Sequence, residues 1–405
     1  MSSEARSAWG GKKVEVAKNV FWVGVVDWNI RNFHGYTYTT KRGSTYNAYL
    51  IIDKKIALVD TVLGSFSGEL IEKIKEFIDP AKIDYVIANH VETDHSGSMP
   101  ELMKLAKNAK VIGTAKCKEG LYRYYYENWD FQVVKTGDSL SLGEKTLKFI
   151  EAPMIHWPDS MFTYIPEDKL LLPNDAFGQH YATTERFDDE VDQCALMDEA
   201  AKYYANILIP YSPMILKKID EVVKSGIEIK TIAPSHGIIW RKDPMKIINA
   251  YVGWAKGFPL KKNVLIVYET MWGATENMAK AILEGLRAGG AEARLFNISV
   301  SDRTEIVKEL FDSRGLIFGS STHDNNMLPN IAGFMDFIKG LKVKNRIGAS
   351  FGSFGWSGEG AKNIEAILKE SGIEIVMPSI AAKYMPSPED LKNCFEFGRN
   401  FAAKI

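Results

Sequence analysis

Two histidines and two carboxylates stand within six positions of the stretch NHVETDHSGS, residues 89–98. They are His90, Glu92, Asp94 and His95, and all four side chains are common ligands of transition metals. The apolar run DYVIA before them places His90 at the end of a strand and the other three on the loop beyond it. This spacing differs from the i, i+4 pair of a helical HExxH site and lets side chains face two neighbouring points. One metal could take His90 and Glu92, and another Asp94 and His95.

Further ligand types occur singly after apolar runs: His156 in APMIHWPDS, Asp175 in LLPNDAFG and His236 in IAPSHGI. They are candidates to complete two coordination shells, in which four of the seven histidines would be ligands. The alternatives are a packed or capping histidine beside a strand and, for the HxExDH stretch, a solvated acidic loop.

A second motif, YETMWGATENMA, joins the predicted strand NVLIVYE to a predicted helix. Its hydroxyls and backbone N–H groups converge at a helix N-terminus, where the helix dipole favours an anion, so Thr270, Gly273, Ala274 and Thr275 are expected to surround a phosphate. Simple helix capping is the alternative. The loops GSSTHDNNM from Gly319 and FGSFGWSGEG from Phe351 follow later strands, and ligands of open α/β sheets bind where such loops converge.

The elements that position these motifs change character near residue 250. Before it, short apolar strands such as NAYLIID, KIALVDT and DYVIANH mix with helices such as SGELIEKIKEFI. From KKNVLIVYET onward, strands alternate regularly with amphipathic helices, which predicts a parallel sheet covered on both faces. We therefore predict an α/β protein with domains at 1–256 and 257–405, joined by the short, tethered linker WAKGFPLKKN.

Composition narrows the function classes. The chain has 405 residues, of which 46% are hydrophobic and 25% charged, and a net charge of -1, so it resembles a soluble globular protein with no nucleic-acid or membrane partner. Its three cysteines are widely scattered and form no CxxC pair, which argues against zinc ribbons, iron–sulfur clusters and a disulfide framework. The N-terminal stretch MSSEARSAWGGKKVEV lacks the apolar core of a signal peptide. A reducing, cytoplasmic location is expected.

The order HxExDH, His, Asp, His resembles the metallo-β-lactamase-like fold, whose hydrolases commonly show HxHxDH and bind two zinc ions. Glu92 replaces the middle histidine, and this change, together with the second half of the chain, resembles the flavodiiron proteins, which bind two irons. The resemblance implies an N-terminal metallo-β-lactamase-like αββα domain followed by a C-terminal flavodoxin-like doubly wound parallel sheet. It also implies the ligand sets: His90, Glu92 and His156 for one iron, Asp94, His95 and His236 for the other, with Asp175 as the bridge.

Charge counting supports iron. Glu92, Asp94 and Asp175 supply three negative charges, so two Fe(II) ions and one bridging hydroxide sum to zero, whereas the hydrolase pattern has one carboxylate fewer. More anionic oxygen donors favour the harder iron over zinc and stabilise oxidised metal. Glu92 is therefore interpreted as a redox substitution.

The resemblance also places His34 in RNFHGY and Tyr203 in KYYANIL near bound oxygen, where either could hydrogen-bond to or protonate a reduced oxygen species. A buried polar residue with a backbone partner is the alternative for each.

The second half resembles flavodoxin, which binds FMN noncovalently. FMN is favoured over FAD because nothing in this half resembles an adenine-binding GxGxxG unit. A typical flavodoxin phosphate loop has Thr where Trp272 stands here, so one hydroxyl contact to the phosphate is absent from the pattern. Trp272 and Trp356 could instead flank the flavin ring, and the alternative is that either one covers the sheet edge. The predicted FMN contacts are Thr270, Met271, Trp272, Gly273, Ala274, Thr275, Ser320, Ser321, Thr322, Asn325, Ser353, Phe354, Gly355, Trp356, Ser357 and Gly358.

Reduced FMN and two Fe(II) ions together hold the four electrons that convert O2 to water, so an O2 reductase is predicted. Reduction of two NO molecules to N2O needs two electrons and is the alternative. The chain has no rubredoxin-like cysteines, so the electron donor is expected to be external. Stretches such as APMIHWPDSMFTY resemble the F420H2 oxidases of methanogens, which makes F420H2 the expected donor and rubredoxin or NAD(P)H the alternatives.

Two other classes remain open, namely a dizinc hydrolase with a flavodoxin domain and an electron carrier that binds FMN alone. A head-to-tail homodimer, or a dimer of such dimers, is expected by the same resemblance. In that arrangement the flavin of one chain faces the metals of the other, because a short linker leaves little freedom for the two sites of one chain to meet.

Overall fold

The computed structural model describes residues 13–257, 259 and 261–405, and it divides into two compact units. The first contains the described residues up to Tyr36 together with Thr40–Tyr203 and Pro213–Val252. The second contains Thr37–Thr39, Tyr204–Ser212 and Gly253–Ile405. Residues 1–12 of the predicted first domain and residues 258 and 260 of the predicted linker lie outside the described residues. The boundary between 256 and 257 stays a prediction.

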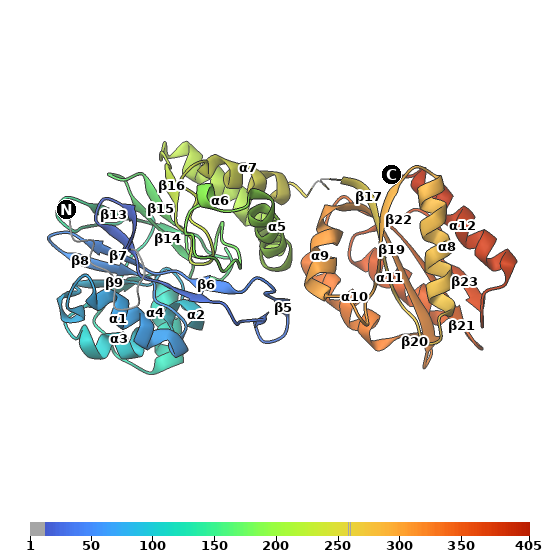
Figure 1. The fold of residues 1–405 in the computed structure, drawn as a ribbon, viewed down its shortest axis with the longest axis horizontal. Coiled ribbons are helices and arrows are strands. Elements are labelled where there is room, and N and C mark those ends of the chain that lie inside the picture. The colour runs from blue at the N-terminus through green and yellow to red at the C-terminus, as the bar shows by residue number, and fades with distance from the viewer. Residues whose placement is uncertain (1–12, 258, 260) are drawn as a thin grey trace. The chain divides into compact units, whose positions relative to one another are not determined.

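The first unit is built on two β-sheets with helices on their outer faces (Figure 1). The larger sheet has the order β1 (Val14–Ala17), β2 (Val20–Trp22), β7 (Tyr49–Ile52), β8 (Ile56–Val59), β9 (Tyr85–Ile87), β10 (Lys110–Gly113) and β11 (Phe131–Val133). The smaller sheet has the order β12 (Ser139–Ser141), β13 (Thr146–Glu151), β14 (Met161–Ile165), β15 (Leu170–Leu172) and β16 (Thr231–Ile232). A small separate pair joins β3 (Val25–Asp27) to β6 (Ser44–Tyr46).

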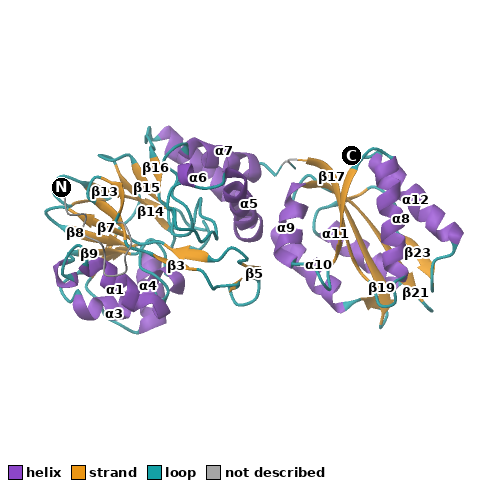
Figure 2. Ribbon diagram, in the orientation of Figure 1, coloured by secondary structure: helices purple, strands orange, loops and turns teal. Residues whose placement is uncertain are grey.

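Helices cover both sheets of this unit, as Figure 2 shows. Those beside the larger sheet are α1 (Ser67–Lys75), α2 (Thr93–Ser96), α3 (Met99–Leu105) and α4 (Ala115–Tyr125). Those beside the smaller sheet are α5 (Gln193–Tyr203), α6 (Ser212–Lys224) and α7 (Pro244–Ala255). This arrangement confirms the predicted αββα layers.

The core of the first unit lies between the two sheets. Successive side chains of a strand point to opposite faces, so Ala57 and Val59 of β8 join this core while Leu58 is buried on the helix-covered face. Phe149 of β13 and Leu172 of β15 meet them from the smaller sheet. Burial on both faces explains why these strands read as continuous apolar runs rather than as alternating ones.

The second unit is a parallel sheet with helices on both faces. Its strand order is β18 (Glu292–Asn297), β17 (Lys261–Glu269), β19 (Ser313–His323), β21 (Ile347–Phe354) and β22 (Glu374–Ile375), with β23 (Ile380–Lys383) also paired to β21 and the short β20 (Asn326–Met327) antiparallel to β19. The helices are α8 (Ala274–Ala288), α9 (Arg303–Asp312), α10 (Pro329–Leu341), α11 (Glu359–Glu370) and α12 (Pro388–Ala402). The first strand lies inside the sheet between the second and third, as in flavodoxin. The predicted doubly wound sheet is confirmed.

Two features of the chain bear on earlier expectations. Cys117, Cys194 and Cys394 are all free thiols. Within the described residues, no helix combines the length and apolar character that crossing a membrane requires.

Helices α8 and α12 approach each other at glycines. A Cβ built on Gly285 of α8 would lie 1.9 Å from the carbonyl oxygen of Phe395, and one built on Gly398 of α12 would lie 2.1 Å from the carbonyl oxygen of Ile282. Both neighbours are backbone atoms, which cannot swing aside as a side chain would. The close packing of these helices therefore depends on the two glycines.

We predict that Gly285→Ala destabilises the second unit by about 1–3 kcal/mol, because the added methyl group forces the helices apart. The matched control is Gly333→Ala in α10, where a Cβ has no atom within 4 Å and alanine has the higher helix propensity. Calorimetric unfolding of the full chain measures both variants. Equal transition temperatures for the two would contradict this account of the helix contact.

Candidate metal centre and flavin site

The HxExDH residues and the three single candidates all come from segments that follow strands. His90 lies three residues after β9 ends at Ile87, and Asp94 and His95 lie in the helical turn α2. The predicted loop is thus partly helical, because Glu92 precedes a turn closed by the bond from the Ser96 N–H to the Glu92 carbonyl oxygen at 3.0 Å. His156, Asp175 and His236 follow β13, β15 and β16, respectively.

The structure gathers all seven predicted ligands into two adjoining groups. Within each group, one potential ligand atom from every residue lies within 4.8 Å of the others. The first group is His90, Glu92, His156 and Asp175, and the second is Asp94, His95 and His236. The two groups contain the same residues as the two predicted ligand sets, with Asp175 at the junction, and their role as metal ligands stays a prediction.

Asp175 faces both groups with different oxygens. Its Oδ2 lies 3.1 Å from His156 Nε2 and 3.7 Å from His90 Nε2. Its Oδ1 lies 3.0 Å from His95 Nε2 and 3.5 Å from His236 Nε2. A carboxylate that presents one oxygen to each of two ligand groups has the geometry needed to bridge two metal ions.

Each group contains a second carboxylate of its own. Glu92 Oε2 lies 3.4 Å from His90 Nε2 and 3.5 Å from His156 Nε2. Asp94 Oδ2 lies 3.0 Å from His236 Nε2 and 3.2 Å from His95 Nε2. Each half of the site thus combines two imidazoles with a carboxylate of its own and one oxygen of Asp175.

Residues behind the ligands fix their orientation, and sequence reasoning did not find them. The Nδ1 of His90 is 3.0 Å from Asp159 Oδ2, which also accepts a bond of 2.8 Å from the Val91 N–H. The Nδ1 of His236 is 2.6 Å from the Thr45 carbonyl oxygen. A hydrogen bond at Nδ1 leaves Nε2 of each ring directed into the cluster, as metal-binding histidines require.

Asp60 connects the two turns that carry ligands. Its carboxylate accepts hydrogen bonds from the Asn89 N–H at 2.8 Å, from Asn89 Nδ2 at 3.2 Å and from Asn174 Nδ2 at 3.1 Å. Asn89 precedes His90, and Asn174 precedes Asp175. Burial raises the pKa of Asp60, and these bonds oppose the rise. The sequence signal was present, because Asp60 follows the apolar strand β8 in ALVDT.

The electrostatics of the site favour bound positive charge. Burial by itself would lower the pKa of His95, yet the nearby Asp94 and Asp175 raise it to about 9. Burial would also lower the pKa of His90, but hydrogen bonds to Asp159 and Glu92 raise it well above its ordinary value. Conversely, burial would raise the pKa of Asp175, but facing imidazoles hold it well below. Metal binding displaces such protons, so the donor set fits two cations.

The two predicted catalytic residues lie beside different ligand groups of this cluster. His34 Nε2 is 3.1 Å from Glu92 Oε1 at a partly exposed edge, where the His34 side chain is 29% exposed. Burial opposes protonation of His34, but Glu92 makes the net shift of its pKa upward. Tyr203 is buried, with its ring centroid 6.3 Å from that of His236. Burial raises its pKa well above the usual value, so the phenol stays protonated.

His180 is a further residue that the sequence interpretation missed. Its ring centroid lies 4.9 Å from that of His236 and 5.2 Å from that of Tyr203, and its Nδ1 lies 2.7 Å from Ser44 Oγ. Burial and the neighbouring His236 lower its pKa well below the ordinary value, so this imidazole is neutral. The apolar context FGQHYA gave no signal that distinguished it from a packed histidine.

In the second unit, the three predicted loops meet at a triangle of hydroxyl groups. Thr275 Oγ1 is 2.9 Å from Ser321 Oγ and 2.8 Å from Ser353 Oγ, and the two serine oxygens are 3.2 Å apart. Gly273 is the N-cap residue that precedes helix α8 and has φ = 86°, and its N–H donates to Thr270 Oγ1 at 3.1 Å. Strands β19 and β21 therefore bring their serine hydroxyls to the N-terminus of α8, which carries Thr275 and where an anion is favoured.

The other predicted flavin contacts divide into exposed aromatic residues and internally bonded ones. Trp272 and Trp356 are 85% and 74% exposed, so neither covers the sheet edge, and both rings are accessible to a planar ligand. By contrast, Ser320 Oγ bonds to the Ser321 carbonyl and Leu328 N–H, and Thr322 Oγ1 accepts from the Gly360 N–H, so these two hydroxyls stabilise loops. Of the remaining predicted contacts, Ala274 is the first residue of α8 and Phe354 the last of β21. The others lie in the segments that follow β17, β19 and β21, and are Met271, Asn325, Gly355, Ser357 and Gly358.

Comparison with known proteins places this architecture in a family. Residues 45–237 match the family described as ODP family beta lactamase, and residues 266–398 match Flavodoxin. The chain is 52% identical to a nitric oxide reductase from Moorella thermoacetica, over 97% of this chain and 98% of that one. It has 37% identity and a TM-score of 0.92 with the flavodiiron protein from Giardia intestinalis, covering 97% of this chain and 96% of the other. The chain belongs to the flavodiiron protein family.

Two more proteins of known name are similar to this chain. The rubredoxin oxygen:oxidoreductase from Desulfovibrio gigas has a TM-score of 0.94 and 37% identity, covering 97% of this chain and 98% of the other. An anaerobic nitric oxide reductase flavorubredoxin from Aeromonas hydrophila is 42% identical over 96% of this chain and 79% of its own length. The chain is thus an oxidoreductase of the flavodiiron type.

The support of His90 by Asp159 leads to a test of the metal centre. Asp159→Asn keeps the size of the side chain but removes the charge that orients the His90 ring, so we expect metal affinity to fall about 10–100-fold. Chelator competition on purified protein measures the affinity. Asp130→Asn is the control, because the Asp130 side chain is 70% exposed. Unchanged affinity in the Asp159 variant would show that the ring needs no carboxylate partner.

The hydroxyl triangle leads to a test of the flavin site. Thr275 is fully buried, so Thr275→Glu puts a negative charge where three loops converge, and we expect FMN affinity to fall at least about 100-fold through repulsion of the phosphate. Thr275→Ser keeps the hydroxyl and is the control. Flavin fluorescence titration gives the affinity, and the unfolding transition of each variant reports on its fold. A folded Thr275→Glu chain that binds FMN normally would refute the assignment.

Proposed function

We propose that this protein reduces the diatomic gases NO and O2 at a diiron centre in its first unit, with electrons delivered through FMN in its second. The observation that carries the proposal is Asp175, whose two oxygens face separate groups of ligands at 3.0 Å and 3.1 Å. A dinuclear centre suits the joint reduction of two NO molecules, and also the reduction of both atoms of O2.

Carboxylate-rich coordination supports iron over zinc. Glu92 and Asp94 each serve one group and Asp175 serves both, so each metal would meet two carboxylates and two imidazoles. Oxygen donors of this kind suit redox-active iron better than they suit hydrolytic zinc. A dizinc hydrolase, and a carrier that holds FMN alone, are the classes that metal and flavin quantification would distinguish from this proposal.

When bound and reduced, FMN would supply two electrons and each of the two irons one, which makes four. Reduction of O2 to water needs all four electrons, whereas reduction of two NO molecules to N2O and water needs two. The chain itself would manage protons and water. His34 lies beside Glu92 at the partly exposed edge and is placed to pass protons inward from Nε2. On the buried side, the Tyr203 hydroxyl stays protonated and can donate a hydrogen bond. Burial of His90, His95 and His236 excludes bulk water from behind the centre.

Relatives support both gases. The Moorella thermoacetica relative is named for nitric oxide reduction, and the Desulfovibrio gigas protein for oxygen reduction with rubredoxin. F420H2 stays a proposed donor on the resemblance of the sequence alone, beside rubredoxin. A head-to-tail homodimer, with the flavin of one chain serving the metals of the other, also stays a prediction.

The decisive test removes the bridging charge. In Asp175→Asn, we expect iron content to fall and consumption of both gases to drop at least about 100-fold, because the neutral amide cannot neutralise two cations. FMN should stay bound and reducible. Asp220→Asn on the exposed face of α6 is the control, since its side chain is 59% exposed.

Anaerobic gas electrodes and metal analysis provide the measurements. Rates of NO and O2 consumption are compared with F420H2, reduced rubredoxin and NADH as donors. Wild-type protein that contains iron and FMN but consumes neither gas with any donor would overturn the proposal. Full activity in Asp175→Asn would overturn the bridging assignment.

A further inference from the structure

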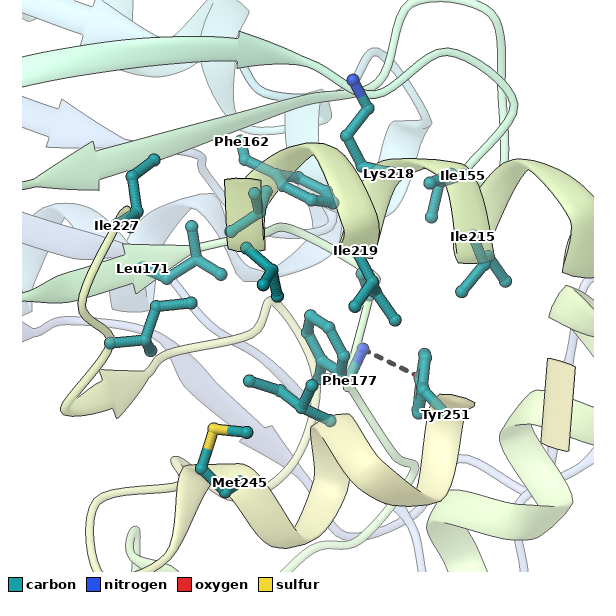
Figure 3. A pocket seen from close by; sticks show the side chains of 15 residues that line it. Ile155, Phe162, Leu171, Phe177, Ile215, Lys218, Ile219, Ile227, Met245 and Tyr251 are labelled. Carbon is teal, nitrogen blue, oxygen red and sulfur yellow. Dashed lines mark hydrogen bonds between the residues drawn. The ribbon is translucent and has the colours of Figure 1, made fainter. Parts of the chain in front are cut away.

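An apolar cavity lies beside the metal cluster in the first unit. Its volume is about 100 Å³, and it is bounded by helices α6 and α7 and by strands β14 and β15 (Figure 3). Thirteen of its fifteen lining residues are aliphatic, Met or Phe, and Figure 3 shows Leu171, Phe177 and Ile219 pointing toward one another. The cavity therefore offers dispersion contacts on nearly all sides.

The two polar lining residues contribute little polarity to the interior. The Tyr251 hydroxyl accepts a hydrogen bond from the Phe177 N–H at 2.8 Å. The Lys218 ammonium pairs with Glu221 at 2.5 Å and points away from the cavity in Figure 3. Water needs two to four polar partners to occupy a cavity, so an apolar space of this kind stays dry and takes apolar guests such as xenon.

Exposure of the lining residues gives the cavity an outer and an inner end. Val223 of α6 and Met245 of α7 are 67% and 48% exposed, so they mark the end that reaches solvent. At the other end, Ile155 and Ala176 are only 4% and 2% exposed. The cavity thus extends from the surface between α6 and α7 into the interior of the unit.

The inner end shares its wall with the proposed iron ligands. Ile155 directly precedes His156, and Ala176 directly follows Asp175. The Cα atoms of adjacent residues in a chain are no more than about 3.8 Å apart, so one layer of backbone and side chains separates the cavity from the cluster. The same two turns that aim His156 and Asp175 at the metals place their neighbours in the cavity wall.

We propose that this cavity is the entry route and holding site for the gaseous substrate, a small neutral diatomic molecule such as O2 or NO. The inference rests on the proposed function, and it names the path by which that substrate arrives. Such a molecule carries no charge and gains by leaving water for an apolar space. A flavin-type or protein donor is far larger than the cavity. Protons use the polar edge at His34 and Glu92, so gas and protons reach the centre from different sides.

Xenon and two blocking variants test this route. Xenon is detected by crystallography under gas pressure, which needs no turnover, and we expect it in the wild-type cavity. Ile219→Phe fills the middle of the cavity. Ile227→Phe narrows the cavity from the loop after α6, and it serves as the second variant if overpacking at Ile219 destabilises the fold. Met214→Phe is the matched control on α6, because Met214 is 40% exposed and does not line the cavity.

The kinetic readout separates gas entry from the other steps. In a folded blocking variant with normal iron and FMN, xenon should disappear and kcat/KM for O2 and NO should fall at least about fivefold. The value of kcat at saturating gas, and the rate of FMN reduction by the donor, should stay within about twofold. Met214→Phe should match the wild type throughout.

The outcomes distinguish this inference from the function on which it rests. If the wild type consumes gas but its cavity takes no xenon, or if a variant that has lost xenon keeps its kcat/KM, the route is wrong while the function stands. If the wild type consumes neither gas with any donor, the proposed function fails, and the route fails with it even where xenon binds.

Discussion

The burial of carboxylates against imidazoles is the constraint on which the first unit depends. A lone carboxylate such as Asp175 would be costly to bury, yet here its charge is compensated by imidazoles on both sides. The partners come from turns that follow different strands, so the compensation is complete only when both sheets have closed on one another. The same charge balance that allows burial prepares the site for cations, since metal ions replace the protons that the carboxylates hold on the rings.

Orientation of the ligands depends on backbone and polar groups far away in the sequence. The Thr45 carbonyl that fixes His236 is 191 residues from it, and Asp159 lies 69 residues from His90. Asp60 ties the turns before His90 and Asp175 to a single buried carboxylate. Because these groups rigidify the ligands before any metal arrives, the site pays little reorganisation on binding. Mutations of Asp159 or Asp60 should therefore change metal affinity although neither side chain is a metal ligand.

The surroundings of the cluster differ in polarity from side to side. His34 and Glu92 form a polar, partly exposed edge, whereas the wall at Ile155 and Ala176 is apolar and buried. This difference follows from the fold, because the αββα layers put one side of the strand-end turns against helices α6 and α7 and leave another to loops. A centre that must receive both an apolar gas and protons benefits from such separation, since each is favoured by a different environment.

The sequence by itself determined the ligand types, the two-part α/β organisation and the phosphate-type loop, because these depend on local spacing and on the periodicity of apolar residues. It also marked Glu92 as the departure from a hydrolase pattern. Only the tertiary structure decided that Asp175 faces both groups, that Asp159 and Asp60 support them, and that Ser320 and Thr322 use their hydroxyls to hold loops. It alone revealed the apolar cavity. Such features arise from contacts between distant segments, and no local pattern encodes which strand ends will meet when two sheets pack together.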